Sequence, residues 1–111
     1  MSVEQPYVVD FVSTDPWGHI VLTIADHLDW SDEKYHIGLL QEKINNYVSF
    51  IESGEFYEAF PHARGRQLVI HVVRKCELPA LAQEFHTHAA TTLRRLNLDF
   101  TSALLADGKP S

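Results

Sequence analysis

The sequence predicts an α+β fold, a two-layer sandwich in which two helices lie on one face of a four-stranded sheet. Short runs rich in β-branched residues alternate with two longer segments that have a helical period. The predicted order is strand, strand, helix, strand, helix, strand (ββαβαβ). A length of 111 residues suits one domain with one core. We therefore expect a single domain over residues 1–111, with residues 106–111 as a flexible tail.

Four segments are expected to form the strands. Residues 8–13 and 20–28 are rich in β-branched and aromatic residues, and residues 15–18 place Pro and Gly in turn positions between them, which predicts a β-hairpin. Residues 68–75 are apolar at both alternating sets of positions, as is typical of a central strand. Residues 98–104 are expected to complete the sheet.

Two segments are expected to be amphipathic helices. The first begins after Ser31, a residue type that caps helices, and stops at Ser53 and Gly54. Its apolar stripe consists of Ile37, Leu40, Ile44, Tyr47, Val48 and Ile51. The second begins at Pro79, and its predicted stripe consists of Leu81, Phe85, Ala89, Leu93 and Leu96. Residues 55–66 are expected to form either a turn of helix or an irregular packing segment.

Strand alternation places apolar residues on both faces of the predicted sheet. The helix-covered face is expected to hold Val9, Phe11, Ile20, Leu22, Ile24, Leu68, Ile70, Val72, Leu98 and Phe100. The second face is expected to hold Val8, Val12, Val21, Val69 and Val73. A monomer rarely leaves such a surface in water, so a homo-oligomer, most simply a dimer, is predicted. A second candidate interface is the side of the first helix that carries Tyr35, Leu39 and Phe50.

The net charge and its distribution along the chain limit the kinds of macromolecule that are expected as partners. The net charge is −6, and residues 1–60 hold eleven acidic residues against two basic ones, whereas residues 61–111 hold four against seven. This balance disfavours nucleic acid as a partner and suits a basic protein partner for the first half. No apolar run is long enough to cross a membrane, and the first residues lack the features of a secretory signal. A cytoplasmic protein without membrane contact is therefore expected.

Seven histidines are the anomaly of the composition. His27 and His71 are expected on the second sheet face, with Asp10 and Asp99 from the outer strands. A carboxylate beside an imidazole can provide a general base or a pH-sensitive contact, and the alternative is an ordinary hydrogen-bonded polar patch. Burial among valines is expected to lower the pKa of His71.

No metal or cofactor is expected. His86 and His88 would point about 200° apart on a helix, so they cannot share one ion. Cys76 is the only cysteine, which leaves no cysteine-rich metal site. His19, His36 and His62 are expected to be exposed.

Several blocks of the sequence occur together in one known family. These are residues 2–5, 9–11, 21–28, 40–45, 50–54 and Gly65-Arg66 before a Val-Ile strand. With these blocks the chain, from about Ser2 to Phe100, resembles a family of short bacterial proteins classed as a domain of unknown function. The resemblance implies a bacterial, cytoplasmic, single-domain protein and brings no activity, cofactor or catalytic residue.

Two function classes therefore remain. The first is a non-enzymatic protein-interaction or self-assembling domain that uses one of the apolar surfaces. The second is a small ligand-binding protein or enzyme that uses Asp10, His27, His71 and Asp99. A pocket where these groups converge would favour the second class.

Overall fold

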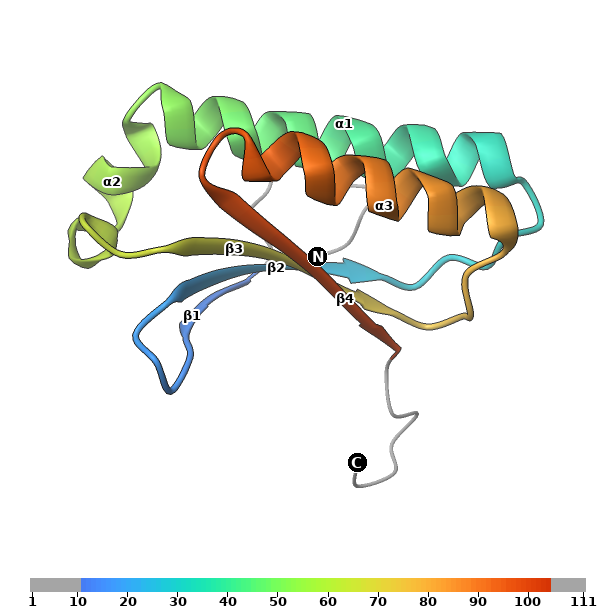
Figure 1. Ribbon diagram of the computed structural model, residues 1–111, viewed down its shortest axis with the longest axis horizontal. Helices are drawn as coiled ribbons and strands as arrows, with labels where there is room; N and C mark the ends of the chain where they lie inside the picture. Colours follow the sequence, from blue (N-terminus) through green and yellow to red (C-terminus); the bar gives the residue numbers. More distant parts are fainter. Residues whose placement is uncertain (1–10, 105–111) are drawn as a thin grey trace.

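The computed structural model describes residues 11–104, and it confirms the two-layer α+β prediction. The strands are β1 (Phe11–Thr14), β2 (Ile20–Asp26), β3 (Leu68–Arg74) and β4 (Leu98–Leu104). They lie side by side in the order β1-β2-β3-β4. The pair β1/β2 is antiparallel, and the pairs β2/β3 and β3/β4 are parallel. The helices all lie on one side of this sheet (Figure 1).

The helices provide the two crossovers that parallel strands require. They are α1 (Glu33–Glu52), α2 (Glu55–Ala59), a 3-10 turn (Pro61–Ala63) and α3 (Ala80–Arg94). The short helix and the 3-10 turn confirm the expected helical or irregular segment between the two long elements. Asp32, rather than Ser31, caps α1, because its carboxylate accepts the Tyr35 amide at 3.1 Å. The Ser31 hydroxyl instead donates to Asp29 at 2.7 Å.

The core lies between the sheet and α1. Its largest fully buried apolar side chains from these elements are Ile20, Leu22, Ile24, Ile70, Val72, Leu40 and Tyr47, and Lys43 and His36 of α1 are fully buried beside them. Phe56 of α2 closes one end of this core and is also fully buried. The predicted inward positions of β2, β3 and α1 are therefore largely confirmed.

The predicted faces of β1 are wrong. Val12 pairs with Leu22 and packs against the core, so it lies on the helix-covered side. Phe11 pairs with Thr23, faces away from the helices and is 61% exposed. The hairpin connection determines which residues of β1 pair with which residues of β2. Since β1 has apolar residues at both odd and even positions, its sequence pattern alone does not determine this register. The predicted positions of Val8, Val9 and Asp10 lie outside the described residues.

The predicted stripe of α3 is also partly wrong. The buried side of this helix consists of Ala82, His86, Ala89 and Leu93. Leu81 and Leu96 are 42% and 43% exposed. Leu96 follows the end of the helix, and Leu81 lies one residue before the buried Ala82, which is about 100° away around the helix. Within residues 11–104, no helix is long and apolar enough to cross a membrane.

Candidate functional site

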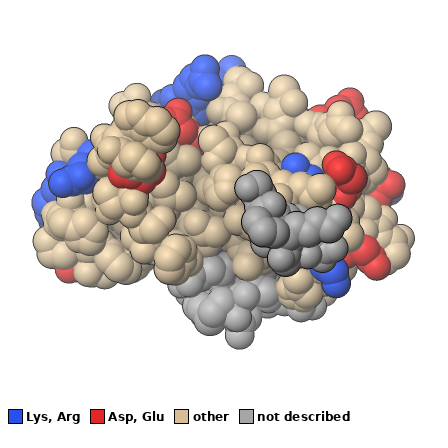
Figure 2. Space-filling view, turned by 90° about the horizontal axis from the view of Figure 1, so that it is seen from below, with Lys and Arg blue, Asp and Glu red and all other residues tan. Residues whose placement is uncertain are grey.

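The side of the sheet that faces away from the helices carries three rows of side chains, set by the strand register. The rows are Phe11–Thr23–His71–Thr101, Ser13–Val21–Val69–Asp99 and Ala25–Val73–Ala103. We call these eleven residues the helix-free face. Asp99 is its only carboxylate, and it contains no lysine or arginine. Where described residues are visible in Figure 2, much of the middle of the view is uncharged, and acidic side chains lie both left of the middle and along the right-hand side.

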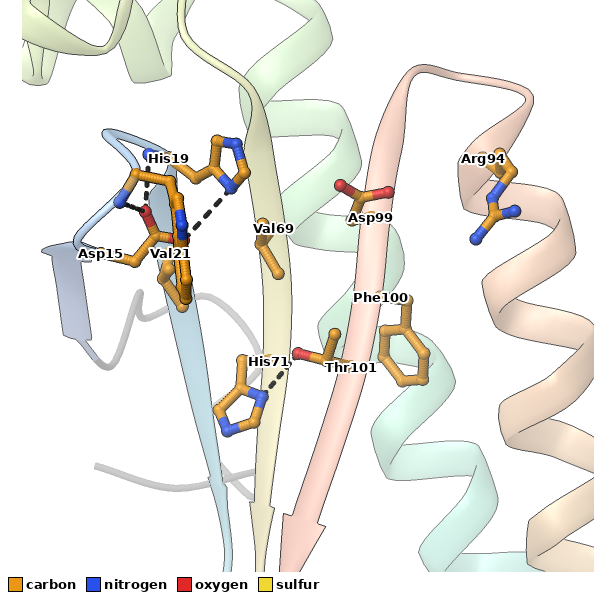
Figure 3. A pocket seen from close by; sticks show the side chains of 10 residues that line it. Asp15, His19, Val21, Val69, His71, Arg94, Asp99, Phe100 and Thr101 are labelled. Carbon is orange, nitrogen blue, oxygen red and sulfur yellow. Dashed lines mark hydrogen bonds and ion pairs between the residues drawn. The ribbon is translucent and has the colours of Figure 1, made fainter.

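A hollow of about 500 Å³ lies where this face meets the β1–β2 turn (Figure 3). Val21, Val69 and His71 form its floor, and Arg94 and Asp99 lie along its β4 side. The turn contributes Asp15, Trp17 and His19 to its wall. The hollow therefore joins the helix-free face to the turn and to the end of α3.

Asp15 builds the turn beside the hollow. One carboxylate oxygen accepts the backbone N–H groups of Trp17 and His19, both at 2.9 Å. The other oxygen lies 3.2 Å from Nδ1 of His19. This bonding holds the Trp17 side chain at the tip of the hairpin, where it is 79% exposed.

His71 occupies the middle of the helix-free face. Its Nδ1 lies 2.6 Å from the Thr101 hydroxyl on the neighbouring strand. Burial lowers the pKa of His71, in the direction expected from its valine neighbours. The ring is therefore held in its neutral form over more of the pH range than an exposed histidine.

The predicted cluster of histidines and carboxylates is only partly brought together. His71 and Asp99 share the hollow, with Asp99 one row away beside Val69. His27 does not join them, because β2 ends at Asp26 and His27 lies exposed beyond the opposite end of the strand. The prediction failed because it continued the alternation to residue 28, past the end of the strand. Asp10 lies outside the described residues.

The hollow lacks the geometry of a nucleophile with an oriented base. Such a base needs a second group that fixes its ring, as well as a bonded hydroxyl. Thr101 bonds the ring of His71, but neither Asp15 nor Asp99 is hydrogen-bonded to that ring among the described contacts. Within residues 11–104, no three histidine, cysteine or acidic side chains lie close enough to hold a metal.

A second polar cluster, which the sequence reasoning missed, is sealed under the helices. His36 is 1% exposed and Asp26 is 3% exposed. Nε2 of His36 lies 2.6 Å from both oxygens of Asp26, and Nδ1 lies 2.9 Å from the Asp29 carbonyl. Trp30 stacks on the same ring with centroids 3.6 Å apart. The cluster fastens the start of α1 to the end of β2.

The expectation that His36 is exposed is therefore wrong. Helical spacing contained the signal, because His36 precedes Leu40 by four residues and extends the apolar stripe of α1. A polar residue on such a stripe needs a buried partner, and Asp26 at the end of β2 provides it. Because both groups are buried, they hold the fold together and are not positioned to meet a ligand.

His86 is the other buried histidine. It is 8% exposed, and its Nδ1 lies 3.0 Å from the Ala82 carbonyl. Its Nε2 is buried with no hydrogen-bond partner among the described residues. Burial is the main cause that lowers the pKa of His86, and the nearby Arg74 guanidinium lowers it further. His88 is exposed, in keeping with the predicted divergence of His86 and His88.

The side chains of the candidate interface on α1 mostly pack within the fold. Leu39 and Phe50 are partly buried against the core, and Phe50 packs edge-on against Phe56 with centroids 5.9 Å apart. Tyr35 alone of the three is strongly exposed, at 57%. This side of α1 therefore offers less free apolar surface than predicted.

The fold and the hollow define a small α+β sandwich with a helix-free sheet face. The chain belongs to the DUF6572 family, which is described only as a family of unknown function and whose model matches residues 1–106. This confirms the resemblance to a family of that kind. Neither a curated protein nor a solved structure matches the chain.

Proposed function

We propose that the protein is a non-enzymatic interaction domain that self-associates through its helix-free face. The observation that carries this proposal is the composition of the face, where Asp99 is the only charged residue among eleven. Surfaces that meet only water are rich in charged side chains, and the centres of protein interfaces are depleted in them. The face thus has the character of an interface centre.

Two exposed aromatic side chains border this face and add to its binding energy. Phe11 lies at the β1 edge of the middle row, and Trp17 lies beside the hollow. They are 61% and 79% exposed. Burying a large apolar side chain contributes about 2 kcal/mol, and aromatic residues are frequent hot spots of interfaces. Phe11 and Trp17 are therefore the expected anchors.

A second copy of the chain is the partner that this surface fits. Because the helix-free face carries almost no charge, it does not require a partner of opposite charge. A two-fold contact between two identical apolar faces is self-complementary. Four strands of up to seven residues span roughly 450 Å² per copy, or roughly 900 Å² for both. This lies near the lower limit of about 1,000 Å² for specific interfaces, so the association should depend on concentration.

A second candidate function is the binding of a small ligand in the hollow. Its volume of about 500 Å³ lies within the range of ligand sites. His71, Thr101 and Arg94 would provide its polar contacts. We rank this function second because the polar groups of the hollow point in different directions (Figure 3).

Light scattering at micromolar concentrations tests the proposal. The wild type should have a mass above the 12.7 kDa of one chain, and Val21→Glu should return it to that mass. The matched control is Tyr35→Glu, which puts the same charge on the α1 side and should leave the mass unchanged. Circular dichroism verifies that both variants are folded.

A wild type that stays at 12.7 kDa at the highest concentration would refute self-association. Dissociation by Tyr35→Glu alone would move the contact to α1. A small molecule that shifts the signals of His71 and Thr101 without changing the mass would favour the ligand-binding candidate.

A further inference from the structure

β4 is an edge strand with a long free side. It pairs with β3 over its whole length, from Leu68↔Leu98 to Arg74↔Leu104, and no described strand lies on its other side. An edge strand presents a row of backbone N–H and C=O groups that another strand can bind. β4 is therefore a potential pairing surface, separate from the helix-free face.

The usual protection of an edge is missing from β4. Proteins guard such strands with lysine, proline, bulges or short length. Residues 98–104 contain no lysine, arginine, proline or glycine, and their register with β3 is unbroken over seven pairs. The other edge strand, β1, is described over only four residues. An unguarded strand of this length is expected to have a partner.

We propose that β4 pairs antiparallel with β4 of a second copy about a two-fold axis at Thr101, forming a continuous eight-stranded sheet. This goes beyond the proposed function, because the contact is made by the backbone edge and not by the face. It would also join the helix-free faces of two copies into one surface, about 900 Å² in area by the same strand dimensions.

The sequence of β4 is self-complementary in this register. With Thr101 opposite its copy, Leu98 stands opposite Leu104, Asp99 opposite Ala103 and Phe100 opposite Ser102. All seven residues are then paired, with leucine against leucine at both ends. Like charges are never opposite, and the two Asp99 carboxylates are about 13 Å apart along the strands, farther than the screening length of about 8 Å.

A different register fits less well. An axis at Asp99 would place the two carboxylates directly opposite each other, which is destabilising in a strand pair. An axis at Phe100 would pair only residues 98–102 and leave Leu104, 43% exposed, without a partner. The axis at Thr101 is therefore the one that the side chains favour.

The helix layer also permits this contact. Phe85, His88 and Thr92 of α3 line a groove shared with α1, so helical spacing puts Gln83, Thr87, Ala90 and Arg94 on the flank away from α1. That flank is hollowed, with about 630 Å³ of space lined by residues that include Thr87 and Ala90. Small side chains there let a second α3 approach.

The charges of the two α3 helices are compatible with the same arrangement. The two-fold axis makes them antiparallel, so the end of one helix lies near the beginning of the other. Arg94 and Arg95 close the helix, and Glu84 lies in its first half. Arg94 of one copy would thus lie nearer to Glu84 of the second copy than to Arg94 of the second copy.

Disulfide trapping tests the edge contact. Thr101→Cys, in a Cys76→Ser background, places two thiols directly opposite each other at the axis, within reach of a disulfide. Mild oxidation should therefore give a covalent dimer. The matched control is Thr23→Cys, which lies in the same row of the helix-free face but on an inner strand, and it should stay unlinked.

The result also separates this proposal from the proposed function. Linking of Thr23→Cys alone would mean that faces stack, which overturns the edge contact and keeps the proposed function. No linking of either variant at concentrations where light scattering gives a dimer also overturns the edge contact. Linking of Thr101→Cys with no effect of Val21→Glu on the mass would support the edge contact and refute the proposed function.

A charge pair at Ala103 gives a second, independent test of the register. Ala103→Asp would face Asp99 of the other copy and should weaken the dimer about five-fold, whereas Ala103→Lys should strengthen it about five-fold. A contact through the face alone would be weakened by both substitutions. Weakening of equal size by both would therefore overturn the edge contact.

Discussion

His36 and His71 are both hydrogen-bonded histidines, but they occupy opposite sides of the sheet. His36 is 1% exposed, and its ring is fixed by Asp26, Asp29 and a stacked Trp30. His71 is partly exposed and is bonded to one hydroxyl. A histidine held on every side has no free atom for a partner, whereas the ring of His71 faces a hollow. The first region therefore stabilises the fold, and the second lies on the face through which we propose that the protein self-associates.

The largest expected effect is on the His36 side. His36→Ala should lower the free energy of unfolding by about 3 kcal/mol, because it leaves the buried Asp26 carboxylate with the Leu28 backbone N–H but without the His36 ring. Urea denaturation measures this value. The control is His62→Ala in the exposed 3-10 turn, which should change stability by less than about 0.5 kcal/mol. Equal effects of the two substitutions would contradict the structural role of the His36–Asp26 pair.

The next effect concerns association on the His71 side. Burial already lowers the pKa of His71, and an interface would bury the ring further. The dimer then binds fewer protons than the free chains, so its affinity should fall by up to about tenfold per pH unit for each such histidine once the pH drops below the already lowered pKa of His71 in the free chain. Sedimentation from pH 8 to pH 5 measures this, and His71→Gln should remove the acid response. The same response in both proteins would exclude His71 from the contact.

Replacing His86, whose buried Nε2 has no hydrogen-bond partner among the described residues, is expected to have a smaller effect on the free energy of unfolding. His86→Leu should raise the free energy of unfolding by about 1 kcal/mol at neutral pH, because it removes a buried polar atom that has no partner. The pKa of His86 is lowered in the fold, so the unfolded chain takes up the proton first. Stability present above pH 6.5 should therefore be lost as the pH falls toward the lowered pKa.

Thermal melts at several pH values separate the effect of the unpaired nitrogen of His86 from the effect of its lowered pKa. The wild type should lose stability on acidification, and His86→Leu should lose less. A His86→Leu variant that is less stable than the wild type at neutral pH would show that Nε2 has a partner after all.

The smallest effect is expected at Thr101. Thr101→Val keeps the shape of the side chain and removes its hydrogen bond to His71, so it should cost about 0.5 kcal/mol. Urea denaturation measures the loss of stability, and NMR titration should show a changed pKa of His71. A loss as large as that of His36→Ala would mean that the two histidine sites are equally important for stability.

Local patterns in the sequence predicted most of the fold. The apolar stripe of α1 and the doubly apolar β3 depend on neighbouring residues, so periodicity found both elements and the central place of β3. Periodicity did not predict the hairpin register, because β1 is short and has apolar residues at both odd and even positions. As a result, Phe11 and Val12 were predicted on the wrong faces of the sheet. Register is a property of two strands, and one strand's pattern does not contain it.

The candidate site was predicted less well, because it depends on contacts between distant segments. His71 and Asp99 were placed on the correct face, since both lie inside strands. His27 was misplaced because β2 ends at Asp26, whereas the β-strand sequence pattern continues to residue 28. His36 was missed because its partner, Asp26, is ten residues away on another element. Arg94 and Trp17 reach the hollow from a helix end and a turn, which no strand pattern describes.

A dilution series followed by methyl NMR tests the central claim, self-association through the helix-free face, most directly. The account predicts that the methyl signals of Val21, Val69 and Val73 shift with concentration, while those of Val48 on α1 stay fixed. Shifts at Val48 with no change at the three valines of the sheet would contradict it, and so would signals that are all independent of concentration.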